Sequence, residues 1–180
     1  MSSQEPRKPL AIGQAKEATL LKLLPPKNVQ LILTWYIKKK TGEAPHRVDT
    51  FSGLIMECKA GKIFFKDGIL DFEPNPFMVK KVKTWPSEIR NILKSYAGTV
   101  FVKSAEKVLK ETYKLVREQE LEKGGMVLEI EVPDAEGYLF QVAILPSGRV
   151  MVFSNQNDDT AQQSALQIVK SLEKSNLVDF

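Results

Sequence analysis

The sequence predicts an α+β fold in which helices pack against mainly antiparallel sheets. Segments with helical periodicity and segments with strand-like alternation both occur, but they do not alternate regularly as repeated βαβ units would. Short glycine-containing turns separate several of the strand-like segments, which favours hairpins and therefore antiparallel pairing. The expected order of elements is ααββ(β)α in the first half of the chain and βαβββα in the second.

The first half begins with a flexible basic arm, residues 1–9, which two helices follow. The first helix, over 14–24, is rich in leucine and stops at Pro25, because proline lacks the amide hydrogen that a helix interior needs. In the second helix, apolar residues three and four positions apart share one face: Val29, Ile32, Leu33, Tyr36 and Ile37. Leu31 and Trp35 form a second stripe, so we expect apolar contacts on two sides of this helix.

Strand-like alternation follows over residues 48–66, and the glycine turn at 60–61 divides it into a hairpin. A proline-rich connection then leads to a third strand at a sheet edge, over 77–83. Proline is tolerated in a first helical turn, so Pro86 is predicted to open a helix that runs to Tyr96.

The second half is predicted to begin with a short strand over 100–102 and a helix over 104–122, with Ser104 as its cap. Three strands and a closing helix complete it, and they span residues 126–132, 137–145, 149–154 and 160–174. Residues 10–97 and 98–180 are either two interlocked halves of a single domain or two small domains.

Charge is divided unevenly along the 180 residues. Residues 1–100 hold 17 Lys/Arg against 9 Asp/Glu, whereas residues 101–180 hold 9 against 13. Nine of the fifteen aromatic residues also lie in the basic part. Single-stranded nucleic-acid binders use cationic side chains beside flat aromatic rings, so the first half is expected to carry a surface of this kind.

The composition argues against several classes of function. The apolar runs are only a few residues long, far short of the roughly 20 that a membrane-spanning helix needs, and the N-terminus lacks the apolar core of a secretory signal. We therefore expect no membrane partner and a cytoplasmic location. Cys58 and His46 are each the only residue of their type, which argues against an internal disulfide, a zinc site and a Cys/His nucleophile.

The candidates for catalysis are three close carboxylate pairs, all in positions that favour acidic residues for structural reasons. They are Asp67 with Asp71, Glu129 with Glu131, and Asp158 with Asp159. The glycine-rich motifs that bind nucleotide phosphates do not occur in the sequence. We therefore predict a binding protein rather than an enzyme, with no cofactor and no metal.

The sharpest basic cluster consists of Lys80, Lys81 and Lys83, next to Trp85. In an extended segment alternate side chains share a face, so Lys81, Lys83 and Trp85 would point the same way. The lysines could then hold phosphates while a base stacks on the indole ring. The alternative is that these lysines protect an exposed sheet edge from pairing with another chain.

A second candidate patch is Lys38, Lys39 and Lys40, in the last turn of the helix that contains Trp35. Cations at a helix C-terminus are also stabilised by the helix dipole without any ligand, and for Trp35 burial in the core is favoured over a stacking role. The chain has 21 Lys but only 5 Arg, and lysine contacts the phosphate backbone rather than reading bases. Nucleic-acid binding through these residues is therefore expected to be tolerant of sequence.

The segment Gly61-Lys-Ile-Phe-Phe-Lys-Asp-Gly resembles the glycine, isoleucine, aromatic and Asp-Gly pattern of PATAN-type regulatory domains. In that family the pattern forms a hairpin in modules that engage partner proteins. The resemblance is confined to this hairpin. It implies an adaptor function and brings no catalytic residues with it.

Two hypotheses follow. The leading one is a protein that binds nucleic acid, single-stranded and without sequence preference, through the lysine and aromatic surface of the first half. The alternative is a protein-interaction or adaptor module that uses the hairpin at 51–70 and the C-terminal sheet. Strands 137–145 and 149–154 of that sheet are apolar on both faces, so a protein partner or a second copy of the chain could cover one of them.

Overall fold

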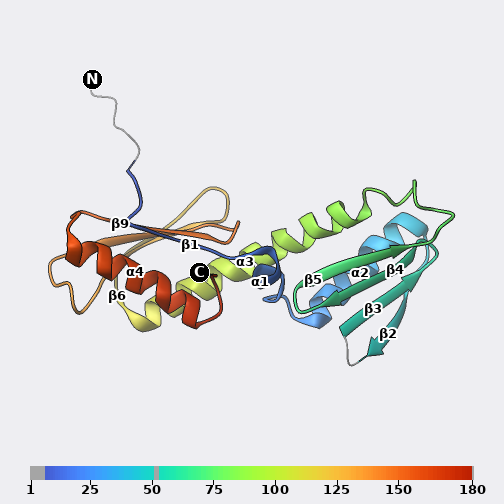
Figure 1. Ribbon diagram of the computed structural model, residues 1–180, viewed down its shortest axis with the longest axis horizontal. Coiled ribbons are helices and arrows are strands. Elements are labelled where there is room, and N and C mark those ends of the chain that lie inside the picture. The colour runs from blue at the N-terminus through green and yellow to red at the C-terminus, as the bar shows by residue number, and fades with distance from the viewer. Residues whose placement is uncertain (1–6, 51–52, 180) are drawn as a thin grey trace, which may run out of the picture. The chain divides into compact units, whose positions relative to one another are not determined.

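The computed structural model describes residues 7–50 and 53–179, so residues 1–6 of the predicted arm and residues 51–52 of the predicted hairpin lie outside the described residues. The described part of the chain contains four helices and nine strands (Figure 1). The strands form one five-stranded and one four-stranded antiparallel sheet. The predicted α+β class is confirmed, and so, in outline, is the predicted succession of helices and antiparallel strands.

The chain divides into two compact units, and α3 (Trp85–Thr112) contributes residues to both. Unit 1 consists of the residues up to 16 and from 98 onward, and unit 2 consists of residues 17–97. Each unit contains one of the two sheets. That either unit is a domain able to fold by itself stays a prediction.

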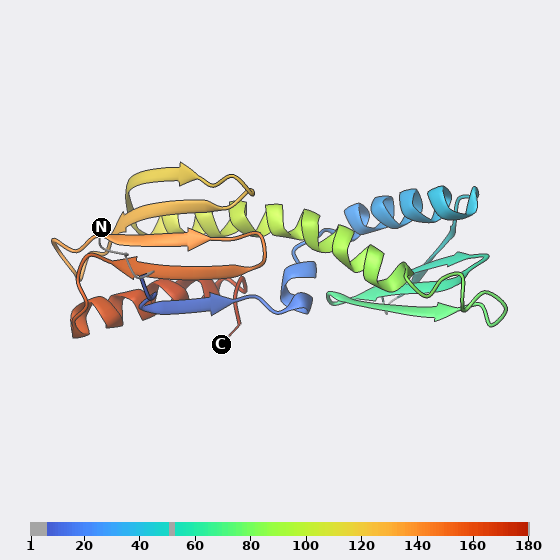
Figure 2. The same ribbon diagram turned by 90° about the horizontal axis from the view of Figure 1, so that it is seen from above.

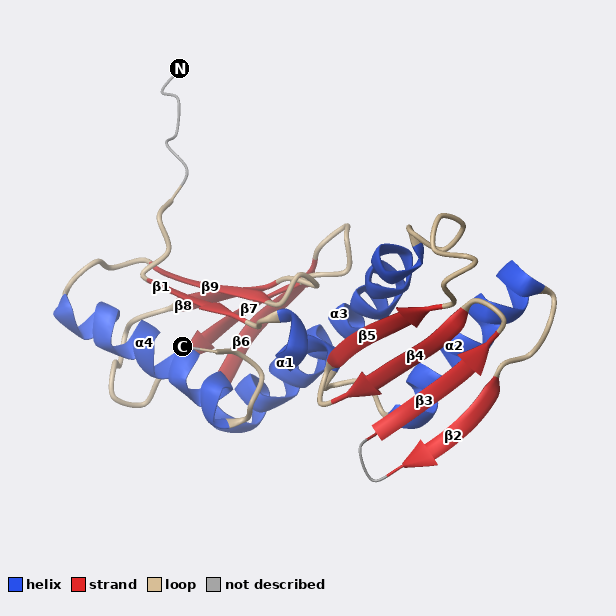
Figure 3. Ribbon diagram, turned by 45° about the vertical axis from the view of Figure 1, so that its right-hand side comes forward, coloured by secondary structure: helices blue, strands red, loops and turns tan. Residues whose placement is uncertain are grey.

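Unit 2 has α2 and the first part of α3 on one face of its sheet, as Figures 2 and 3 show. The strand order is β2-β3-β4-β5, and each strand is antiparallel to its neighbours. The elements are α1 (Glu17–Leu21), α2 (Pro26–Thr41), β2 (His46–Thr50), β3 (Gly53–Cys58), β4 (Gly61–Lys66) and β5 (Ile69–Pro74). The hairpin predicted around residues 60–61 is confirmed as β3–β4.

The core of unit 2 lies between the sheet and these two helices. Alternation along the strands turns one set of side chains inward: Leu54, Met56, Ile63, Phe65 and Leu70. The helix α2 buries four of the five residues predicted to share its face, namely Val29, Leu33, Tyr36 and Ile37. The fifth, Ile32, is half-buried. From α3 the buried residues are Trp85, Ile89, Leu93 and Ala97.

The turn between β4 and β5 packs closely on α1. Gly68 in this turn has a φ of 76°, which is the left-handed region, and a Cβ at this position would collide with the carbonyl oxygen of Ala18. Glycine meets both demands without strain. Lys94 of α3 also forms an ion pair with Glu17 at 3.2 Å, so α1 is held to the rest of the unit at a second point.

Unit 1 has the strand order β1-β9-β8-β7-β6. Besides the last part of α3, its elements are β1 (Ala11–Gln14), β6 (Lys114–Glu120), β7 (Met126–Glu131), β8 (Phe140–Ile144), β9 (Arg149–Ser154) and α4 (Asp159–Lys174). The helix α4 packs against β1 and β9 and buries a stripe of apolar residues, Ala161, Ala165, Ile168, Val169 and Leu172. Asp158 caps this helix, because its carboxylate accepts a hydrogen bond from the amide of Ala161 at 2.9 Å.

The strand predicted over residues 100–102 is wrong, because these residues lie within α3. Short apolar runs occur both in strands and in buried helices, and here a buried residue recurs at every fourth position of the helix: Ile89, Leu93, Ala97, Phe101, Ala105 and Leu109. The helix ends at Thr112 instead of continuing to 122, and residues 114–120 form strand β6. Nε of Arg117 lies 3.3 Å from Oε2 of Glu129 on the neighbouring β7. This cross-strand ion pair stabilises the charged segment as a strand.

Two further local predictions are wrong. Residues 77–83 form turns rather than an edge strand, because Asn75 starts a turn after β5 and its side-chain oxygen accepts a hydrogen bond from the amide of Phe77 at 3.0 Å. The first predicted helix, over 14–24, is reduced to α1, because Gln14 belongs to strand β1 and residues 22–24 turn toward Pro25. Among the described residues, no helix combines the length and the apolar character needed to cross a membrane.

Candidate functional site

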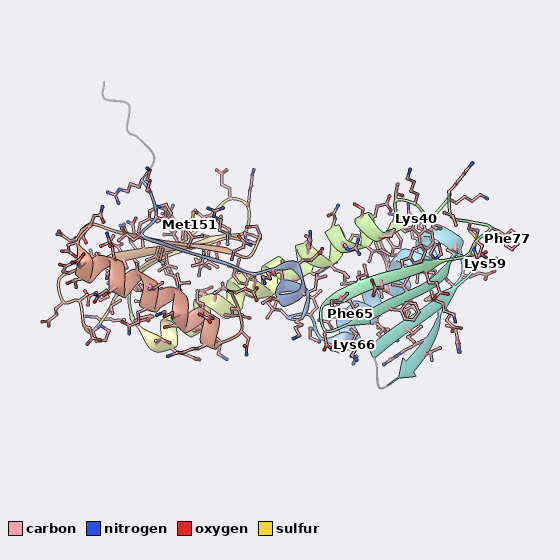
Figure 4. The ribbon with its side chains drawn as sticks, viewed as in Figure 1. Lys40, Lys59, Phe65, Lys66, Phe77 and Met151 are labelled. Atoms are coloured by element: carbon pink, nitrogen blue, oxygen red, sulfur yellow. The ribbon has the colours of Figure 1, made fainter. Side chains whose placement is uncertain are left out.

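The two predicted lysine clusters lie at the same end of unit 2. Lys38, Lys39 and Lys40 are exposed in the last turn of α2, and Lys80, Lys81 and Lys83 are exposed in the loop that precedes α3. The end of α2 contacts the beginning of α3, where Lys40 pairs with Glu88 at 3.4 Å. Figure 4 shows Lys40, Lys59 and Phe77 at this end, and Phe77, from the same loop as the second cluster, is 96% exposed.

Trp85 does not offer the stacking face that its sequence position beside the lysines predicts. Its side chain is only 5% exposed. The indole meets the ring of Tyr36 edge-on at 5.4 Å and stacks on Phe72 at 6.1 Å between ring centroids. The prediction required an extended segment up to residue 85, whereas the chain turns and α3 begins at Trp85, which directs the ring into the core.

Trp35 differs from its prediction in the opposite direction. Its pattern favoured burial in the core, whereas it is 54% exposed. The ammonium group of Lys39 lies 5.0 Å from the centre of the indole ring, a cation–π contact along the surface of α2. One helical turn earlier, Leu31 is 61% exposed. The second apolar stripe predicted for this helix is therefore a surface feature of the chain.

These two residues belong to an apolar groove between α2 and α3. We call it the α2–α3 groove. It has a volume of about 280 Å³ and is lined by Leu31, Ile32, Trp35, Ile92 and Tyr96. Tyr96 is 57% exposed. Sequence patterns alone did not identify Ile92 and Tyr96 as site residues. The pattern that could have identified them is their spacing of one helical turn on a face of α3 that does not contribute to the core.

Helical spacing puts three lysines of α2 beside the groove residues Leu31 and Trp35, and we call them the rim of the α2–α3 groove. Lys27, Lys38 and Lys39 are exposed on α2 and form no ion pair with any described residue. Residues 17–97 as a whole contain 14 Lys/Arg against 8 Asp/Glu. An anionic or acidic ligand is therefore attracted to this part of unit 2.

Glu88 does not cancel this charge, because it is already engaged. It accepts a hydrogen bond from the hydroxyl of Tyr36 and faces the ammonium group of Lys40. The hydrogen bond from Tyr36, followed by the attraction of Lys40, lowers the pKa of Glu88 below its usual range. Burial, together with the neighbouring carboxylate, raises the pKa of Tyr36 well above its usual value. At neutral pH the pair is therefore an ionised carboxylate that accepts from a neutral phenol.

The two adaptor surfaces predicted from the sequence differ from the α2–α3 groove in their lining, and the hollow of about 440 Å³ on the β3–β4 surface includes Lys66, Asp71 and Glu73. In the β3–β4 hairpin, Ile55 and Phe64 are cross-strand neighbours on the side away from the helices, and both are half-buried. In unit 1, alternation along β9 places Met151 on the sheet face opposite α4, where it is half-buried (Figure 4). Its neighbour Ala143 is nearly buried. Of the described residues on these two surfaces, no aromatic side chain is as exposed as Trp35.

No three His, Cys, Asp or Glu side chains within residues 7–50 and 53–179 are arranged so that they could hold a metal ion. Cys58 is half-buried and carries a free thiol. The resemblance of the β4–β5 segment to PATAN-type domains stays an expectation, because comparison with models of protein families, with curated proteins and with solved structures finds no match to this chain.

Proposed function

We propose that this chain is a non-catalytic adaptor module that binds a protein partner in the α2–α3 groove. The observation that carries the proposal is the contiguity of the apolar side chains that line this groove. Single exposed apolar residues are ordinary, whereas a continuous apolar surface with a hollow in it marks a binding site. Leu31, Trp35 and Tyr96 are each more than half exposed and meet in one place.

The size and lining of the groove favour a protein partner over a small metabolite. Its volume of about 280 Å³ is at the lower limit for a small-molecule site, and its lining offers few polar groups that could orient a metabolite. It is large enough to take one or two apolar side chains. Tryptophan and tyrosine are the residues most often found at the energetic centre of protein interfaces, because they bury much area and lose little conformational entropy.

We expect a photo-crosslinking amino acid at position 35 of the full chain to form an adduct with one discrete protein when the chain is expressed in its own cells. The same amino acid at position 62, an exposed site on the opposite face of the sheet, should give no such adduct. Leu31→Ser should reduce the adduct at position 35 by about tenfold, because an anchor residue commonly contributes 1–2 kcal/mol. The measurement is gel analysis and mass spectrometry of the crosslinked product.

Two results would contradict this proposal. One is an adduct yield at position 35 that does not exceed the yield at position 62. The other is an adduct that survives Leu31→Ser without loss, since the crosslink would then report chance proximity rather than binding in the groove.

A second candidate function is nucleic-acid binding, which the placement of the two lysine clusters favours. Lys38 to Lys40 and Lys80, Lys81 and Lys83 are all exposed at one end of unit 2, with Phe77 and Trp35 as accessible rings. Lysines of this kind neutralise phosphates, and exposed rings accept stacked bases. The loss of Trp85 from the accessible surface removes one of the stacking residues on which this candidate depended.

This candidate predicts that a labelled 20-nucleotide oligo(dT) binds between 50 and 200 mM salt with log K falling linearly against log salt, about 0.7 per phosphate neutralised. Replacing Lys81 and Lys83 together by Glu should flatten that slope. The matched control reverses the same number of charges at Lys62 and Lys66 on the outer sheet face and should leave the slope almost unchanged. Absence of binding at 50 mM salt would eliminate the candidate.

A further inference from the structure

We infer that the partner segment bound by the α2–α3 groove is an acidic amphipathic helix. This inference rests on the proposed adaptor function and adds the chemistry of the partner to it. It is carried by two features of the groove, the helical spacing of its lining residues and the sign of the charge around it.

The lining residues are spaced to receive a third helix. Leu31 and Trp35 lie one turn apart on α2, and Ile92 and Tyr96 lie one turn apart on α3. The two helices run side by side in opposite directions in unit 2 (Figure 2). A groove between two such rows accepts the apolar ridge of another helix, whose residues at i, i+3, i+4 and i+7 repeat with the same period.

The charges follow the same helix face as the apolar residues. Lys27 lies four residues before Leu31, and Lys38 and Lys39 lie three and four residues after Trp35. Residues three and four apart are neighbours on a helix surface, so cations stand at both ends of the apolar pair. A helix that places apolar side chains in the groove therefore brings its flanking positions to these ammonium groups.

Four of the eight Asp and Glu residues of unit 2 are paired with lysines other than Lys27, Lys38 and Lys39. Glu88 is held by Lys40 and Tyr36. Three others pair with lysines away from the groove, and these pairs are Glu17 with Lys94, Glu43 with Lys59, and Glu57 with Lys62. Acidic flanks on the partner are thus complementary to the rim, and basic flanks would be repelled by it.

Other occupants fit the groove less well. A second copy of this chain would bring two cationic rims together, which is an arrangement that disfavours association. A nucleic acid would satisfy the lysines and could stack on Trp35. However, it would leave the aliphatic side chains Leu31, Ile32 and Ile92 facing a polar backbone.

Two synthetic helical peptides test the inference on the full chain. Both carry leucines at i, i+3, i+4 and i+7, and one has glutamates at all flanking positions where the other has lysines. Binding is followed by the methyl NMR signals of Ile32 and Ile92. We expect the glutamate peptide to shift both signals and to bind at least about tenfold more tightly than the lysine peptide, as complementary charges at an interface rim discriminate partners.

Lys27→Glu combined with Lys38→Glu should reverse this preference, and the methyl signals of the buried Ile89 and Leu93 report whether the variant remains folded. Equal binding of both peptides overturns the acidic character of the partner. If neither peptide shifts Ile32 and Ile92, the helical partner is excluded. Crosslinking from position 35 then decides separately whether the groove binds any protein. If oligo(dT) shifts the signals of Ile32 and Ile92 and the glutamate peptide does not, the inference is also overturned and nucleic acid is the favoured ligand.

Discussion

Replacing Trp85 by alanine is expected to destabilise unit 2 by about 3–5 kcal/mol, the usual cost of removing a large buried aromatic side chain. The indole is almost fully buried and contacts both Tyr36 and Phe72, so its loss leaves a cavity where α2, α3 and β5 meet. Urea denaturation followed by far-UV circular dichroism measures the change. Amide exchange of β3 and β4 assigns it to unit 2.

Trp35→Ala is the matched control for this experiment. The same chemical change at a side chain that is 54% exposed should alter the free energy of unfolding by no more than about 1 kcal/mol. The two tryptophans are thus expected to separate, with Trp85 required for the fold and Trp35 for binding. Equal losses of stability in the two variants would show that our assignment of their roles is wrong.

Gly68→Ala is expected to cost about 2–4 kcal/mol, combining the strain of a left-handed backbone at a residue with a Cβ and the cost of overpacking. The φ of Gly68 is 76°, and the added methyl group would collide with the carbonyl oxygen of Ala18. Either the β4–β5 turn or α1 must then move. The measurement is again the free energy of unfolding from urea denaturation.

Gly42→Ala separates the two causes. Gly42 ends α2 with a φ of 77°, nearly the same backbone conformation, but no atom lies within 4 Å of the position that its Cβ would occupy. This variant should therefore show only the backbone strain, about 1 kcal/mol. If Gly68→Ala costs no more than Gly42→Ala, the close packing of α1 on the turn contributes nothing to stability.

The parts of the fold that could be predicted are those in which local periodicity and burial coincide. The inward faces of α2 and α4 follow the 3.6-residue period, and the β3–β4 hairpin follows its glycine turn. The continuous helix α3 could not be predicted, partly because Gly98 reads as a break. In the structure Gly98 lies inside the helix, where a Cβ would collide with the carbonyl oxygen of Pro146. Glycine is required there by a contact that is distant in sequence.

The candidate site was only partly predictable for a similar reason. The second stripe of α2, Leu31 and Trp35, is visible from its spacing, and so are the lysines that follow it. The other wall of the groove, Ile92 and Tyr96, comes from a helix that only the tertiary fold brings alongside. Pro86 correctly predicts where α3 begins, but the exposure of Trp35 and the burial of Trp85 depend on how α3 packs against α2 and β5, which local sequence does not determine.

Strand β1 has a consequence for the order of events during folding. It precedes unit 2 in the chain, yet its partner β9 follows unit 2, with Ile12 opposite Met151. A nascent chain leaving the ribosome therefore carries β1 unpaired until β9 has been made. Unit 2 is contiguous in sequence, and short turns join β3 to β4 and β4 to β5, so we expect it to form first and to shorten the loop that must close. Until that closure, the edge of β9 that β1 later covers is open to pairing with another chain, while its other edge pairs with β8.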